Sequence, residues 1–128
     1  MHMKLLVHVN EPERWAIAIG NITNFLNDVG DEHASVVVVA NGAGVKGYAV
    51  EAEAYGASQG TVCAVGQASN LMSMEMLSKR GLTFFACRNA LSTQNMSVES
   101  LPDFVQVVPA GMTEMVKRQA EGYAYIKP

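Results

Sequence analysis

Residues 35–40 read Ser-Val-Val-Val-Val-Ala, and residues 41–47, directly after them, read Asn-Gly-Ala-Gly-Val-Lys-Gly. A continuous run of β-branched residues is typical of a strand that is covered on both faces, as in a parallel sheet. The glycines that follow indicate that the chain turns as it leaves this strand. This stretch therefore predicts an α/β domain built on a mainly parallel sheet.

Short apolar segments on both sides of this run predict four more strands, at residues 4–9, 82–86, 104–108 and 123–126. Apolar residues recur at helical spacing between them, and we expect helices at residues 12–29, at 68–80, from about 89, and at 112–121. Strands that alternate with helices pack in layers. We therefore expect one three-layer α/β/α domain over residues 1–128, with a sheet of about five strands.

Finer details of the helices and strands are also predicted. The pattern at residues 48–55 predicts a helix, and residues 61–65 are expected to form a short extended segment. In the last helix the residues expected to face the core are Met112, Met115, Val116 and Ala120. The chain has 8 methionines, and we expect them mainly on inner helix faces, as filler of the core or of a subunit interface.

Composition and charge argue against several classes of function. The 128 residues carry a net charge of −3, and the Lys and Arg residues are scattered, so no basic stripe is available for nucleic acid. The longest apolar run has the length of a strand, far short of the roughly 20 residues of a membrane span. No secretion signal is recognisable, so we expect a cytoplasmic protein whose two cysteines are reduced thiols.

The order of the predicted elements places the candidate site. In an open parallel sheet, ligand sites form outside the carboxyl ends of the strands. Three segments follow predicted strands in this way, and they begin at His8, Asn41 and Cys87. Because parallel strands end at the same edge of the sheet, we expect these three segments to lie together.

Cys87 is the candidate for catalysis. It lies between a strand end and a helix start, where backbone N–H groups and the helix dipole favour a nucleophilic thiolate. Arg88 adds a positive charge beside it. The alternative is that Cys87 is a small buried apolar residue, as most free cysteines are. Cys63, which lies among valines, is expected only to pack.

The other candidate residues each have two interpretations. Gly42 and Gly44 contact a ligand or merely turn the chain, since their loop lacks both phosphate-binding glycine spacings, G-x-x-x-x-G-K-[ST] and G-x-G-x-x-G. His8 is a base or ligand, or else a structural residue held by a hydrogen bond. The three histidines and two cysteines have no close ligand spacing, so no metal site is expected.

Three segments together resemble a known family. Residues 82–91, LTFFACRNAL, resemble the strand–cysteine unit of the DsrE/DsrF-like (YchN-like) sulfur-relay proteins. Residues 107–112, VVPAGM, and 119–128, QAEGYAYIKP, resemble the C-terminal part of the same family. The similarity covers nearly the whole chain, with a gap at residues 50–69.

This resemblance implies a three-layer α/β/α domain that assembles as a homo-oligomer, a trimer or a hexamer. It also implies that Cys87 accepts a sulfane sulfur from a donor protein as a persulfide and passes it to an acceptor protein. Such a transfer needs no cofactor. Arg88 and the helix N-terminus would stabilise the sulfur anion, and Asn89 or Asn41 would orient it.

Two other functions are compatible with the same residues. In the first, the protein is a non-catalytic oligomeric module that binds a small molecule or anion through His8 and the glycine loop at subunit boundaries. In the second, it is an oligomeric scaffold in which Cys87 only packs.

Overall fold

The computed structural model describes residues 1–50 and 61–128, with the side chains of the second range described from Gly66 onward. Its strands are β1 (Met3–Val9), β2 (Ala34–Ala40), β3 (Thr83–Cys87), β4 (Val105–Val108) and β5 (Ala124–Ile126). They form one sheet in the order β4-β3-β2-β1-β5, and every neighbouring pair is parallel. The expected parallel sheet of about five strands is confirmed.

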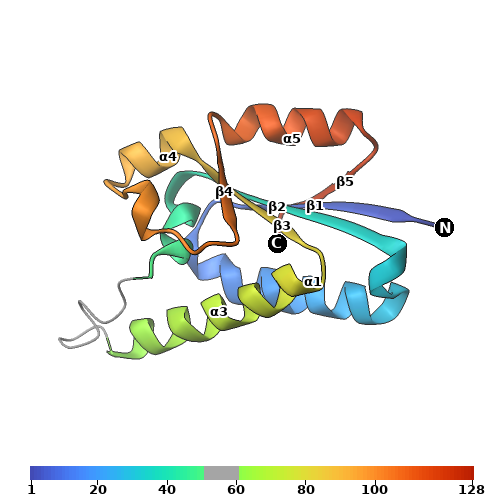
Figure 1. Cartoon of the computed structure of the whole chain (residues 1–128), viewed down its shortest axis with the longest axis horizontal. Helices are drawn as coiled ribbons and strands as arrows, with labels where there is room; N and C mark the ends of the chain where they lie inside the picture. Colours follow the sequence, from blue (N-terminus) through green and yellow to red (C-terminus); the bar gives the residue numbers. More distant parts are fainter. Residues whose placement is uncertain (51–60) are drawn as a thin grey trace.

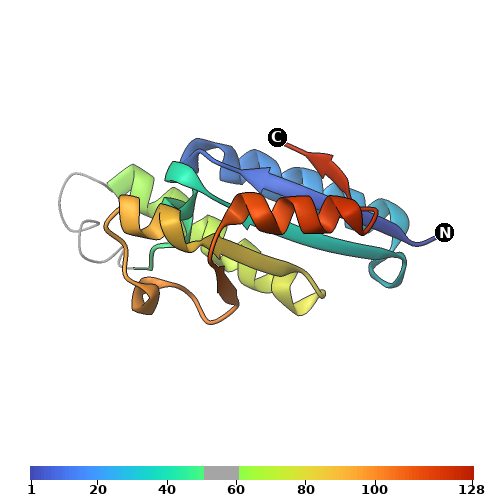
Figure 2. The same ribbon diagram turned by 90° about the horizontal axis from the view of Figure 1, so that it is seen from above.

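Helices cover both faces of this sheet. On one face lie α1 (Trp15–Val29) and α3 (Thr61–Lys79), and on the other lies α5 (Gly111–Ala120), as Figure 1 shows. Seen from above, α5 runs along the middle of the sheet, and the short α4 (Arg88–Thr93) lies beyond its end (Figure 2). The three-layer α/β/α architecture is confirmed.

Short 3₁₀ segments connect these elements. They are η1 (Pro12–Arg14), η2 (Asp31–His33), η3 (Gly42–Tyr48) and η4 (Val98–Ser100). Gly30 ends α1 at φ 90°, a conformation that glycine adopts without strain.

The valine run lies in the centre of the sheet and is buried on both sides. Val36 and Val38 pack toward α1 and α3, whereas Val37 and Val39 pack beneath α5. Burial of both faces explains why the run is continuous rather than alternating. The helical spacing in α1 is confirmed in the same way, since its buried positions include Trp15, Ile19, Ile22 and Leu26.

Two expectations for residues 48–65 have different outcomes. The prediction that residues 61–65 are extended is wrong, because α3 begins at Thr61. The β-branched residues there favour a strand only weakly, and continuity with the long helix that follows overrides this preference. Tyr48 ends η3 rather than starting a helix, and most of the predicted helix at 48–55 lies outside the described residues.

The inner face of α5 differs from the prediction. Met115 is buried as expected, but Met112 and Val116 are 66% and 59% exposed, and Ala120 is also exposed. The inward position next to Met115 belongs to Glu114, whose Oε2 accepts a 2.7 Å hydrogen bond from Arg118 Nε. An ion pair between the buried Glu114 and the half-buried Arg118 therefore occupies the face on which apolar residues were expected.

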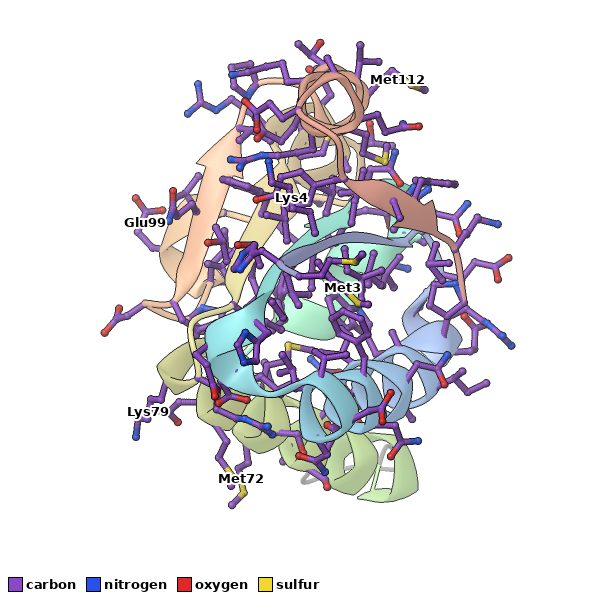
Figure 3. The ribbon with its side chains drawn as sticks, turned by 90° about the vertical axis from the view of Figure 1, so that its right-hand side faces the viewer. Met3, Lys4, Met72, Lys79, Glu99 and Met112 are labelled. Atoms are coloured by element: carbon purple, nitrogen blue, oxygen red, sulfur yellow. The ribbon has the colours of Figure 1, made fainter. Side chains whose placement is uncertain are left out.

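Most methionines lie on the surface instead of on inner helix faces. The exposed ones are Met1, Met3, Met72, Met76 and Met112. Met72 and Met112 lie on opposite sides of the molecule in Figure 3, one on α3 and one on α5. The expectation that most methionines lie on inner helix faces is wrong, while a role of the exposed ones in a subunit interface stays a prediction.

Within the described residues, no helix combines the length and the apolar character needed to cross a membrane.

The glycine loop η3 packs tightly against the start of α1. Trp15 Nε1 donates a 2.8 Å hydrogen bond to the carbonyl of Gly44. A Cβ at Gly44 would overlap the Val9 carbonyl, and a Cβ at Gly47 would overlap the Trp15 indole. The loop can lie this close to the end of β1 only because neither position has a side chain.

The end of η3 is attached to β3. The hydroxyl of Tyr48 donates a 3.0 Å hydrogen bond to the carbonyl of Phe85, and burial raises the pKa of this phenol well above its usual value. The Tyr48 ring packs against Trp15, with centroids 5.1 Å apart. The loop after β2 is therefore held between β1 and β3, and the contact of Tyr48 with β3 fixes where the loop ends.

A substitution at Gly47 tests this packing. In Gly47→Ala the new methyl group meets the rigid Trp15 indole, and we expect the free energy of unfolding to fall by about 1–3 kcal/mol. Gly20→Ala is the matched control, because a Cβ there meets nothing within 4 Å in the middle of α1. The control should stabilise the protein by about 0.5–1 kcal/mol. Urea unfolding measures both changes, and equal effects would contradict the packing described.

Candidate functional site

Four polar side chains form a row across the carboxyl edge of the sheet, one from each of four adjacent strands. Tyr125 belongs to β5, His8 to β1, and Cys87 ends β3, while Asn41 is the first residue after β2. The register places Asn41 and Cys87 at one level, because Ala40 pairs with Ala86. His8 pairs with Val39 and Tyr125 pairs with Leu6, so the row steps back by two residues at β1 and by two more at β5.

The four side chains lie on the face that α5 covers. Residues two apart along a strand point to the same face. The core beneath α5 contains Leu6, Val39 and Phe85. His8, Asn41 and Cys87 each lie two positions after one of these residues, and Tyr125 pairs with the first of them.

His8 links two members of the row through both nitrogens of its ring. Nδ1 lies 2.6 Å from the hydroxyl of Tyr125, and Nε2 lies 2.7 Å from Oδ1 of Asn41. An amide oxygen can only accept, so Nε2 carries a proton. In the neutral ring, Nδ1 then accepts a hydrogen bond from the tyrosine hydroxyl.

Cys87 and Asn41 approach each other beneath the first residue of α5. The position that a Cβ would take at Gly111 lies 3.3 Å from the Cβ of Asn41 and 3.3 Å from the Cβ of Cys87. The two Cβ atoms are therefore separated by no more than twice that distance. Gly111 allows the N-terminus of α5 to lie directly over them, where the N–H groups of a first turn favour negative charge.

Cys87 is buried, with 7% of its surface exposed. It is also the N-cap residue of α4, and its Cβ lies close to Gly111 at the start of α5. Arg88 and Asn89, the next two residues, have exposed side chains. The row of four residues does not include them.

The two candidate glycines lie beside the row and shape it. Gly42 adopts φ +52° directly after Asn41, a conformation that favours glycine. Gly44 is buried against Val9, and its carbonyl already accepts from Trp15. Their loop thus turns the chain immediately after Asn41.

Sequence reasoning did not identify Tyr125 or Gly111 as part of this site. The strand that carries Tyr125 was expected, but not that it pairs with β1. A glycine directly after Pro109 and Ala110, where a strand gives way to a helix, was the available signal for a close helix–sheet contact. The side chain of Cys63 lies outside the described part of the chain, so the expectation for it stays a prediction.

In the described ranges 1–50 and 61–128, no group of three or more His, Cys, Asp or Glu residues is arranged to hold a metal ion.

A cavity of about 240 Å³ lies at the opposite edge of the sheet, near the starts of β2 and β3. Arg80 and Arg118 line it, but each faces a carboxylate. Arg80 donates to Asp31 at 2.8 Å and lowers its pKa, and Arg118 donates to the buried Glu114. Because these charges are balanced, the cavity has no excess of positive charge for an anion.

Comparisons with known proteins agree with this fold. No curated protein matches the chain. Among solved structures, it is similar to the protein of unknown function MTH1491 from Methanobacterium thermoautotrophicum, with 29% identity and a TM-score of 0.75. That match covers 98% of this chain and 99% of the other. The sequence model of the DsrE/DsrF-like family matches residues 3–128. The chain therefore belongs to the DsrE/DsrF-like family.

Proposed function

We propose that this protein carries sulfane sulfur as a persulfide on Cys87. Membership of the DsrE/DsrF-like family suggests a role in sulfur relay at the level of the family. The observation that supports Cys87 as the carrier is its place at the carboxyl edge, at the start of α4 and close to both Asn41 and Gly111.

The transfer needs only thiol chemistry. The Cys87 thiolate attacks the outer sulfur of a donor persulfide, R–S–SH. The new S–S bond forms as the donor S–S bond breaks, and the donor leaves as a thiolate that takes up a proton from water. An acceptor thiolate then attacks the outer sulfur on Cys87, which leaves as a thiolate. Each step moves one sulfur atom without net oxidation, so no metal or organic cofactor is required.

The surroundings of Cys87 favour negative charge on the sulfur. Ala110 precedes α5 and has no side-chain group that could cap the N–H groups of its first turn. The positive end of this helix dipole lies close to Cys87, and the exposed Arg88 adds a cation at the start of α4. These groups support a persulfide in its anionic form.

The burial of Cys87 is compatible with a carrier. A persulfide extends the side chain by one S–S bond of about 2 Å. Since Cys87 already has 7% of its surface exposed, the outer sulfur is in a position to meet a small thiol or the cysteine of a partner. The inner sulfur stays shielded from other oxidants and nucleophiles. We place this exchange in the cytoplasm, where thiols remain reduced, with a donor protein and an acceptor protein as partners.

Intact-mass measurement tests the carrier directly. After incubation with cysteine persulfide, the wild-type protein should gain one sulfur atom that dithiothreitol removes. Cys87→Ser should gain none, because its hydroxyl is a poor nucleophile. Cys63→Ser is the matched control and should load like the wild type.

Loading that persists in Cys87→Ser would contradict the proposal. Absence of loading together with anion binding that survives in Cys87→Ala would favour a binding module instead.

We also propose that the protein assembles as a homo-oligomer, a trimer or a hexamer, through the side formed by β5 and α5. Tyr125 and Ile126 are 40% and 47% exposed on the edge strand, and Met112 and Val116 are exposed on the neighbouring helix. Exposed apolar side chains on an edge strand and on a helix favour association. Contact over β5 would also shield the hydrogen bond between Tyr125 and His8 from water.

Substitution at Ile126 tests this assembly. Light scattering should give a multiple of three chains for the wild type, whereas Ile126→Lys should shift the mass toward a monomer, because the contact would have to bury a charge. Met72→Lys is the control, since Met72 is exposed on the opposite side of the molecule. A monomeric wild-type protein at micromolar concentration would contradict the proposal.

A further inference from the structure

The hydrogen bond from His8 fixes the orientation of the Asn41 side-chain amide. Nε2–H of His8 holds Oδ1 toward β1 at 2.7 Å. The oxygen and nitrogen of a carboxamide lie on opposite sides of its carbon, so this contact turns Nδ2 away from β1. On the other side of Asn41 lies β3, which ends at Cys87.

We propose that Tyr125 and His8 are positioning residues for sulfur transfer. They hold the Asn41 amide so that its Nδ2–H groups donate to the anionic sulfur on Cys87. Both Cβ atoms lie 3.3 Å from the same point at Gly111, which brings the two side chains close enough for this contact. The inference rests on the proposed function of Cys87 and adds to it the residues that orient the sulfur.

The tyrosine hydroxyl suits this task because it both donates and accepts. It donates to Nδ1 of a neutral His8 ring and accepts from Nδ1 of a protonated one, at 2.6 Å in this structure. Nε2 keeps its proton in both states, so Asn41 keeps its orientation.

Without the hydroxyl, the neutral ring is free to carry its proton on Nδ1 instead. Nε2 then becomes an acceptor, and the Asn41 amide turns over to donate to it. The amide oxygen would face Cys87, where it repels a sulfur anion. The Tyr125 hydroxyl thereby selects the orientation of Asn41 that favours the persulfide.

No covalent bond forms between members of the row. The sulfur atom moves only between the donor and Cys87, and Tyr125, His8 and Asn41 act through hydrogen bonds. We therefore expect the loss of these hydrogen bonds to slow the transfer step and to leave donor binding unchanged.

Single-turnover loading with cysteine persulfide tests this role in two tyrosine variants. Tyr125→Phe removes one hydroxyl and should lower the maximum loading rate about tenfold, since hydrogen bonds to charged groups are the strong ones, with the half-saturating donor concentration unchanged. Tyr123→Phe is the matched control in the same segment, because its ring lies beside Lys4 and Arg118 instead of the row. It should load at the wild-type rate.

Equal rates in Tyr125→Phe and the wild type would overturn the positioning role and leave Cys87 as the carrier. Equal slowing in both variants would overturn it as well, since the effect would then not be specific to the row.

A second measurement does not depend on sulfur transfer. Nitrogen-15 NMR of the neutral His8 ring should show the proton on Nε2 in the wild type and a mixture of the two forms in Tyr125→Phe. A wild-type ring with its proton on Nδ1 would overturn the proposal. If the wild-type protein takes up no sulfur at all, the proposed function fails, while this spectrum still decides whether the row orients Asn41.

Discussion

The parallel pairing of β1, β2 and β3 brings three strand ends to one level of the sheet, and the site depends on this register. A shift of one residue in any pair would turn the side chain at that strand end to the opposite face. His8, Asn41 and Cys87 share the face beneath α5 because each strand reaches the edge with the same alternation. The buried valine run holds the central strand in place on both faces, so the register is strongly determined.

Close contacts of the glycine loop and of α5 with the strand ends position the side chains of the site. The loop after β2 lies against Trp15 and the end of β1, which sets the position of Asn41. From above, Gly111 lets α5 reach both Asn41 and Cys87. The positive end of the helix dipole therefore lies beside the one thiol whose surroundings the structure describes. Two kinds of feature meet here: donors that favour a sulfur anion, and a hydrogen-bonded row that orients one of them.

Local patterns in the sequence predict most of the fold, but they predict only three of the four residues in the row. Cys87, Asn41 and His8 were placed at a common edge because strand ends in a parallel sheet converge there. Tyr125 could not be added, since its role requires β5 to pair with β1, and strand order depends on contacts distant in sequence. The inner face of α5 was predicted wrongly for a similar reason: the buried Glu114, bound by an arginine one turn later, takes a position where apolar residues were expected.

The central claim is that the sulfur on Cys87 meets an oriented donor from Asn41. Proton–nitrogen NMR of the Asn41 side-chain amide, recorded before and after loading with cysteine persulfide, tests this contact most directly. The account predicts that one Nδ2 proton shifts downfield on loading and returns when dithiothreitol removes the sulfur, as expected for a hydrogen bond to an anion. Cys87→Ser treated in the same way should show no shift. An Asn41 amide that is unchanged while Cys87 carries the extra sulfur would contradict the account.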